Sequence, residues 1–320
     1  MLDNLLFSLN TVAPIFVIVI LGALLSKFKF FEGSFLSACD RVVFKICLPC
    51  LIFQDVATAN LEEGFDLKLI LFSTAAVVIM AFLLCLTVPF FVHDNAKRGA
   101  FIQGAYRSNS AILGVTLAYN MFGESGTTTI AMILPFVVAL YNVFAVVILS
   151  VFAPSEAKLS PTALAKKIGK SIITNPLIIS IILALVWQLL PIPEMPVLMD
   201  RSLSYLADMA MPLALISLGG NFRLESLRGR LSLAIVSSAV KTAVIPLVTI
   251  LAAALIGIRG VELGIVFIIF GGPTAVSSYI MAKEMKSDYE LAGQVLLIST
   301  LMSIITLFAG IFILKEMSLI

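Results

Sequence analysis

The chain has 320 residues, of which 60% are hydrophobic and 12% are charged, and its mean hydropathy is +1.10. This composition excludes an ordinary soluble domain and predicts an all-α polytopic protein of the lipid bilayer. The formal net charge of +2 gives no electrostatic basis for binding nucleic acid.

Apolar stretches long enough to cross a bilayer recur along the whole chain. A transmembrane helix needs about 20 predominantly apolar residues. Ten stretches are close to this length, although the second, fourth, seventh and eighth also contain charged residues. The sequence therefore predicts ten transmembrane helices, at residues 5–26, 34–57, 67–92, 97–122, 127–153, 171–191, 197–220, 231–257, 260–284 and 289–314.

The basic residues distinguish the two sides of this arrangement. On one side, the loops contain Lys27, Lys29, Lys97, Arg98, Lys158, Lys166, Lys167, Lys170, Arg223, Arg228, Arg230, Lys283 and Lys286. On the other side, the basic residues are Lys68, Arg201, Arg259 and Lys315. Because Lys and Arg are enriched in cytoplasmic loops, both termini are expected outside the cytoplasm, in a multi-pass protein of the cell membrane.

The longest loop divides the predicted spans into two equal sets. Residues 154–170 are basic and contain two prolines, and they separate a first repeat at 1–153 from a second at 171–320. An odd number of spans in each half forces opposite orientations, so the repeat is expected to be inverted. Three pairs of features support this duplication: Leu48-Pro49 with Met211-Pro212, Arg98-Gly99 with Arg259-Gly260, and Pro14 with Pro176.

Two spans are interrupted about halfway along their length. Residues 107–110 lie about ten residues inside the fourth span, and helix rise places them roughly 15 Å deep. Residues 271–275 interrupt the ninth span with two flexible glycines and a proline that removes a backbone donor. Irregular backbone at this depth is tolerated only inside protein or beside a water-filled cavity. Breaks at matching places in two repeats indicate the substrate site of a transporter.

Several motifs together resemble the auxin efflux carrier family, which includes plant auxin exporters and bacterial permeases for malate or malonate. The resemblance covers the whole chain. It differs at Val115-Thr116, where the family usually has a proline shortly after the glycine of the fourth span. The motifs are Leu48-Pro49, Arg107-Ser108-Asn109 with Gly114, 175–178, 210–219, Pro273-Thr274-Ala275, Ala282, Asp288 and Ser299-Thr300.

This resemblance implies an architecture and a mechanism. Spans one, two, six and seven would form a scaffold, through which a homodimer could form. Spans three to five and eight to ten would form a mobile transport unit, with the fourth and ninth spans crossing at their breaks. The expected function is secondary transport of small organic anions, such as malate, malonate or auxin-like acids, by elevator-type alternating access.

Charges near the middle of the spans indicate the substrate class independently of the resemblance. Lys45, Arg107, Asp208 and Lys241 lie at this depth, where a charge costs at least about 2.5–3.5 kcal/mol and usually faces a cavity or a partner. Three of these side chains are basic and one is acidic, and the two breaks add half-helix N-termini with partial positive charge. A site of this kind favours an anionic substrate, most simply a carboxylate. The expected substrate-binding residues are Arg107, Ser108, Asn109, Ser110, Lys241, Gly272, Pro273, Thr274 and Ala275.

A buried ion pair is expected between Lys45 and Asp208. These residues are separated by the same number of positions as Pro49 and Pro212. They are therefore equivalent positions of the two repeats, on spans two and seven. We expect them to approach each other, directly or through water, and to support the scaffold.

The sequence leaves other roles and functions open. Arg107 could bond carbonyl groups freed by the break in the fourth span, and Lys241 could be a structural counter-ion.

A sodium- or proton-coupled symporter of another organic solute is the second hypothesis for the function. Against it, residues 99–123 and 263–283, which contain the breaks, have no Asp or Glu to hold a coupling ion. An intramembrane enzyme or sensor is the third, but the spans offer no acid–base pair. Cys47 and Cys50 have the spacing of half a metal site, but no second pair of cysteines or histidines is available to complete it. No metal and no cofactor are therefore expected.

Overall fold

A computed structural model describes residues 2–31, 33–58, 66–154, 162, 166, 169, 170, 172–190, 195–222 and 229–320, with side chains for all of these except 2–12, 33, 111 and 112. Most of the predicted linker at 154–170 lies outside these residues. The described part of the chain is helical, and its only β contact is one isolated bridge between residues 108 and 274.

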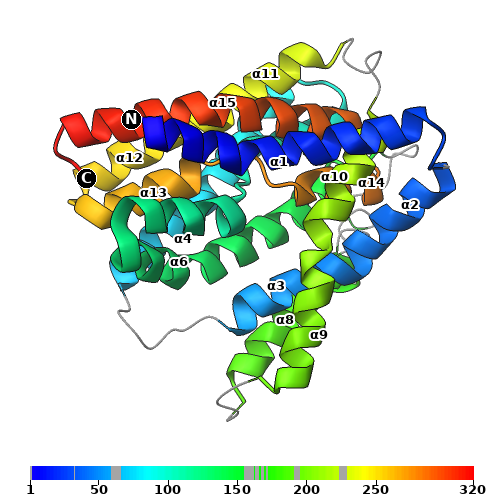
Figure 1. Cartoon of the computed structure of the whole chain (residues 1–320), viewed down its shortest axis with the longest axis horizontal. Helices are drawn as coiled ribbons and strands as arrows, with labels where there is room; N and C mark the ends of the chain where they lie inside the picture. The colour runs from blue at the N-terminus through cyan, green and yellow to red at the C-terminus, as the bar shows by residue number, and fades with distance from the viewer. Residues whose placement is uncertain are drawn as a thin grey trace.

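The helices form an elongated bundle in which both chain termini lie at the same end (Figure 1). Short π turns or a 3-10 turn join some of them. The helices are α1 (Leu2–Lys27), α2 (Gly33–Val42), α3 (Leu48–Ala57), α4 (Leu67–Thr87), α5 (Asn95–Tyr106), α6 (Val115–Val151), α8 (Pro176–Gln188), α9 (Val197–Asp208), α10 (Ala210–Asn221), α11 (Leu231–Ala239), α12 (Ile245–Leu255), α13 (Gly260–Gly271), α14 (Ser277–Glu284) and α15 (Tyr289–Glu316). The turns are η1 (Val43–Cys47), η2 (Val88–Phe90), η3 (Ser110–Gly114) and η5 (Val240–Val244).

Described helices fall in each of the ten ranges that the sequence predicted as spans. Five continuous stretches are long and apolar enough to cross a bilayer: Leu67–Phe90, Val115–Val151, Val197–Asn221, Leu231–Leu255 and Tyr289–Glu316. These stretches make the protein an all-α membrane protein. That all ten ranges cross the bilayer as an inverted repeat stays a prediction.

Glycine and proline explain the irregular points in these helices. Within α6, Gly123 has a φ of 63° and a ψ of −143°, which separates the end of the fourth predicted span from the fifth. The π turns η1 and η5 each end just before a helix whose second residue is a proline, Pro49 in α3 and Pro246 in α12. Proline lacks the N–H that would bond the carbonyl one turn earlier, so a wider turn is tolerated at these points.

Two apolar cores organise the bundle. The first is formed by α4, α5, α6, α11, α12, α13 and α15. The second is formed by α1, η1, α3, α8 and α10, together with α14 and the C-terminal half of α6. The α14 helix therefore packs into the second core although α13, which precedes it, belongs to the first. The break between α13 and α14 is the point where the chain passes from one core to the other.

Small residues bring α1 and α10 into close contact in the second core. A Cβ added at Gly22 of α1 would collide with the Ile216 backbone of α10, and one added at Gly219 would collide with the Val19 backbone of α1. Helices that lack a side chain at the contact can approach through their backbones, a common arrangement in membrane proteins. This pair ties the first and seventh predicted spans together.

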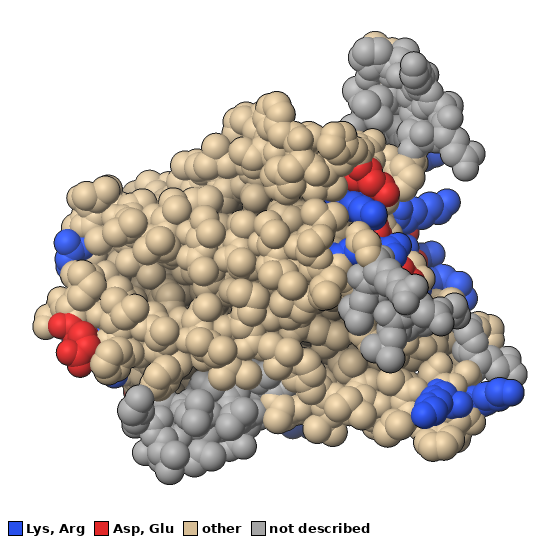
Figure 2. All heavy atoms as spheres, turned by 90° about the horizontal axis from the view of Figure 1, so that it is seen from above, with Lys and Arg blue, Asp and Glu red and all other residues tan. Residues whose placement is uncertain are grey.

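Lys and Arg side chains gather at the end of the molecule opposite the termini. Figure 2 shows them at the right of the view, with a broad uncharged surface between the two ends.

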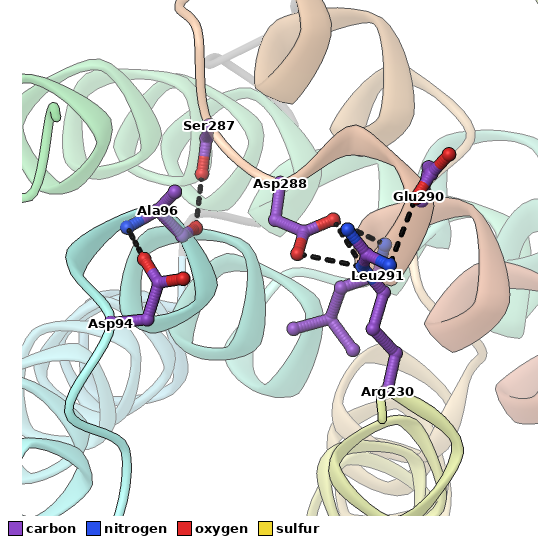
Figure 3. Close-up of polar contacts among 7 residues, drawn as sticks. All are labelled: Asp94, Ala96, Arg230, Ser287, Asp288, Glu290 and Leu291. Carbon is purple, nitrogen blue, oxygen red and sulfur yellow. Dashed lines mark hydrogen bonds and ion pairs between the residues drawn. The ribbon is translucent and has the colours of Figure 1, made fainter. Parts of the chain in front are cut away.

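Polar contacts join the starts of several helices at this end (Figure 3). Asp288 caps α15 by accepting from the Leu291 N–H at 3.0 Å and forms an ion pair with Arg230 at 2.8 Å. Arg230 also pairs with Glu290 at 3.0 Å. Burial acts to lower the pKa of Arg230, but its bond to Asp288 and the two carboxylate charges outweigh it, so the pKa is raised.

The start of α5 is attached to the same cluster. The Ser287 Oγ and the Asp288 N–H both donate to the Ala96 carbonyl, at 2.6 Å and 3.2 Å. Asp94 caps α5 by accepting from the Ala96 N–H at 2.9 Å. These hydrogen bonds and ion pairs therefore join the N-terminal ends of α5, α11 and α15 at the basic end.

Candidate functional site

The two interrupted stretches meet where α5 leads into η3 and α13 leads into α14, as the sequence predicted. Ser108 and Thr274 form an isolated antiparallel bridge, and the Asn109 N–H donates to the Pro273 carbonyl at 2.8 Å. Gly272 permits this approach, because a Cβ there would lie 2.9 Å from the Ser108 Oγ. Backbone groups freed by the two breaks are thus partly paired with each other. We call residues 107–110 and 272–275 the crossing.

Side chains hold the crossing in place but leave polar groups without partners. The Thr274 Oγ1 donates to the Gly104 carbonyl at 2.7 Å, and the Thr274 N–H donates to the Ser299 Oγ at 3.1 Å. In contrast, the hydroxyl oxygens of Ser108 and Ser110 are buried and bond to no residue that the structure describes. Buried polar groups of this kind normally have partners, so these hydroxyls are candidates for ligand contact.

Asn109 adds a further free polar group at the crossing. Its side chain is 8% exposed and makes no hydrogen bond within the described ranges. An amide both donates and accepts hydrogen bonds. Pro273, whose carbonyl accepts from the Asn109 N–H, is buried, as is Ala275.

Arg107 places a buried positive charge at the crossing. Its Nη2 donates to the Asn142 Oδ1 at 2.7 Å, and its Nη1 contacts the Met281 Sδ at 2.6 Å. A thioether is a weak acceptor. No carboxylate in the described part of the chain forms an ion pair with Arg107. The guanidinium is therefore well oriented but poorly neutralised.

Lys241 supports the crossing from the carbonyl end of α13. Its side chain is fully buried, and its Nζ donates to the Phe270 carbonyl at 2.5 Å. A cation at a helix C-terminus is favourable, because carbonyl groups there lack helical partners. Lys241 therefore stabilises the half-helix that leads into the crossing, and its expected contact with substrate stays a prediction.

The expected buried pair of Lys45 and Asp208 is not formed. Both residues are exposed, and no ion pair joins them in the described structure. Lys45 lies in the π turn η1, whose wider turn changes the direction of its side chain relative to a regular helix. A different buried pair is present at the basic end, where the Lys283 Nζ lies 2.5 Å from the Asp40 Oδ2.

A cavity of about 500 Å³ opens at the edge of the second core, at the basic end. It is lined by parts of η1, the end of α6, the start of α8 and the end of α14, including Lys45, Glu284, Met285 and Lys286. No residue of the crossing lines this cavity. The crossing is therefore enclosed by protein on the side of this cavity.

Some residues of this site carried no signal in the sequence. Met281 contacts Arg107 but has a residue type that is common in any apolar helix. Ser299, which bonds the Thr274 N–H, belongs to a motif of the family resemblance, but that motif assigned it no contact. Asn142 was recognisable only as one of several polar residues in apolar spans, any of which is more often a contact between helices than a ligand. Its bond to Arg107 depends on the packing of α6 against the crossing.

Interrupted helices that meet inside an apolar helical bundle define a class of protein, the multi-pass membrane transporters. The comparisons with known proteins agree with this class. A family model described as "Membrane transport protein" matches residues 7–309, and the chain belongs to this family, that of the auxin efflux carriers. The protein is thus a transporter by family.

The chain is also similar to individual transporters along nearly its whole length. It is 25% identical over 309 residues to a protein of Rhizobium meliloti (strain 1021) named "Putative malonate transporter", covering 95% of each chain. It is 24% identical over 306 residues to an "Uncharacterized transporter" of Methanocaldococcus jannaschii, covering 93% of this chain and 96% of the relative. A third relative, from Methanothermobacter thermautotrophicus, is 24% identical over 305 residues, covering 94% of this chain and 96% of the relative.

Proposed function

We propose that the protein is a secondary transporter of small organic anions and binds the carboxylate of its substrate at the crossing. The observation that carries this proposal is the environment of Arg107, a buried guanidinium whose neighbours are an amide oxygen and a thioether. A carboxylate would offer two charged acceptors to the planar guanidinium in place of the weak thioether. It would also accept from the free hydroxyls of Ser108 and Ser110 and from the Asn109 amide.

The proposed transport cycle moves one set of spans against the other. The ten predicted spans would form inverted repeats, with residues 1–153 and 171–320 on either side of the linker. Spans one, two, six and seven would be the scaffold, and the remaining spans would carry the crossing across the membrane in an elevator-type movement. The excess of basic residues at one end supports a cytoplasmic location for that end, and extracytoplasmic termini. A homodimer through the scaffold helices belongs to the same proposal.

The position of Lys241 favours a carrier that does not use sodium. Carbonyl groups at the end of a half-helix are where a coupling sodium ion would be expected to bind. Here the Lys241 ammonium already occupies the last turn of α13, through its bond to the Phe270 carbonyl. The Lys241 ammonium thus supplies the positive charge that a sodium ion would otherwise bring to the end of α13. A proton-coupled cycle and an uncoupled one are both compatible with this arrangement.

Uptake into proteoliposomes tests the proposal directly. The purified protein is reconstituted and given malate, malonate, short monocarboxylates and indole-3-acetate, each with no gradient, with a sodium gradient and with a pH gradient. We expect saturable uptake of at least one of these carboxylates, with no stimulation by sodium. An Arg107→Lys variant in the same liposomes is the matched control for the crossing. Uptake equal to that of protein-free liposomes for every anion would overturn the proposal.

A further inference from the structure

The cavity at the basic end has a positive lining that the crossing does not explain. Lys45 reaches it from η1, and Lys286 reaches it from the loop after α14, with Glu284 as the carboxylate beside them. The N-terminus of α8, capped by Asn175, borders the same space and adds a partial positive charge. Among the residues that the structure describes, two lysines, a helix N-terminus and one carboxylate line this space.

Lys286 adopts a backbone conformation that favours glycine. It has a φ of 60° and follows α14 in a Schellman motif, in which its N–H donates to the Lys283 carbonyl at 3.2 Å and the Ser287 N–H donates to the Ala282 carbonyl at 2.7 Å. A residue with a Cβ is strained in this left-handed region. Strained residues tend to occur at functional sites. Unlike Lys29, which also has a positive φ, Lys286 lines the cavity with its side chain.

One face of α14 runs from the cavity to Arg107. Met285 lines the cavity, and Met281, one turn earlier on the same helix, contacts the Arg107 guanidinium. Residues four apart lie on one face of a helix. Methionine side chains are flexible and unbranched, so they can move aside without a change in the backbone. An anion that left the cavity along this face would pass these two thioethers.

We infer that Lys45 and Lys286 form a first-contact site for the substrate carboxylate, from which the anion moves past Met285 and Met281 to the crossing. This inference rests on the proposed function and adds a second binding place at the basic end. Glu284 opposes anion binding there, because its carboxylate lies in the same lining. The site concentrates anions at the mouth of the path, and salt screens it because its lysines contact water.

Kinetic variants test this inference in proteoliposomes, with malonate as the probe. Lys45→Gln and Lys286→Gly should each raise the KM by about fivefold, the effect of a partly exposed charge, and leave kcat nearly unchanged. Glu284→Gln should lower the KM. A general disturbance of folding would not produce these opposite signs.

Lys29→Gly is the matched control. Lys29 also has a positive φ, of 56°, after a helix on the basic side of the chain, but it does not line the cavity. Both glycine variants should keep or raise the Tm, because glycine relieves the same strain, while only Lys286→Gly should change the KM. An unchanged KM in Lys45→Gln and Lys286→Gly, with malonate uptake by the parent, would overturn the first-contact site and leave the proposed function standing.

Lysine acetylation gives a readout that does not depend on transport. The detergent-solubilised protein is treated with an amine-acetylating reagent with and without malonate at constant ionic strength, and modified peptides are quantified by mass spectrometry. We expect malonate to protect Lys45 and Lys286 but not Lys29. Equal modification of all three lysines in both conditions would overturn the inference. Protection without uptake would support the first-contact site and count against transport of this anion.

Discussion

Replacement of Arg107 by lysine should sharply impair transport although the positive charge is kept. The guanidinium is held by the Asn142 Oδ1 at 2.7 Å and the Met281 Sδ at 2.6 Å. Lysine has a single nitrogen at its tip and cannot contact Asn142 and a carboxylate with the parallel geometry of a planar fork. Arg107→Lys therefore keeps the electrostatic attraction and removes the orientation of the substrate.

The magnitude follows from the hydrogen bonds that are lost. A hydrogen bond to a charged group contributes about 1.5–3 kcal/mol, and we expect lysine to lose one such bond to the bound anion. Each 1.4 kcal/mol corresponds to about a tenfold change in an equilibrium constant. The kcat/KM for the transported anion should therefore fall by about 10- to 100-fold. Asn142→Leu should cause a smaller loss, because it removes one support of Arg107 and leaves the guanidinium itself.

Initial rates of uptake in proteoliposomes measure this effect, with the amount of inserted protein determined for each variant. The Tm of each variant in detergent shows whether the fold is kept. If Arg107→Lys transports the anion within twofold of the parent, the guanidinium does not orient the substrate. Arg107 would then serve only to support the break in the fourth predicted span.

Three further outcomes are expected from the contacts of the crossing and the bundle. Asn109→Ala should lower the transport rate by about tenfold or more with little change in Tm, because its amide has no partner among the described residues; a rate equal to that of the parent would exclude it from the site. Gly219→Ala should lower the free energy of unfolding by about 1–3 kcal/mol, as its methyl group overpacks the contact with α1; thermal unfolding in detergent measures this, and no loss would mean that α1 and α10 can separate. Asp288→Ala should destabilise the protein more than Asp288→Asn, because asparagine keeps the cap of α15 that costs about 1 kcal/mol to remove; equal losses in the same assay would show that the ion pair with Arg230 dominates.

The breaks were predictable because the chemistry that interrupts a helix is local. Gly272 and Pro273 disturb the helical backbone wherever they occur together, and polar residues 107–110 are costly in an apolar stretch unless they are paired. Their crossing was implied by the resemblance to the auxin efflux carriers. The helix ranges were predictable for the same reason, since length and hydropathy are properties of continuous segments.

The direction of individual side chains was not predictable in the same way. The expected pairing of Lys45 with Asp208 assumed regular helices, whereas η1 inserts a π turn at Lys45. A helical repeat read from sequence does not reveal one extra residue in a turn. The contacts of Arg107 with Asn142 and Met281 join residues far apart in sequence, and they depend on how α6 and α14 pack around α5.

Counterflow of a carboxylate tests the central claim most directly. Proteoliposomes are loaded with unlabelled malonate and diluted into a trace of labelled malonate, with the parent protein, Asn109→Ala and protein-free liposomes compared side by side. A carrier with its site at the crossing should accumulate label transiently with the parent protein and fail to do so with Asn109→Ala. Accumulation that is equal in the parent and Asn109→Ala would contradict a substrate site at the crossing. No accumulation by the parent would contradict carriage of this carboxylate.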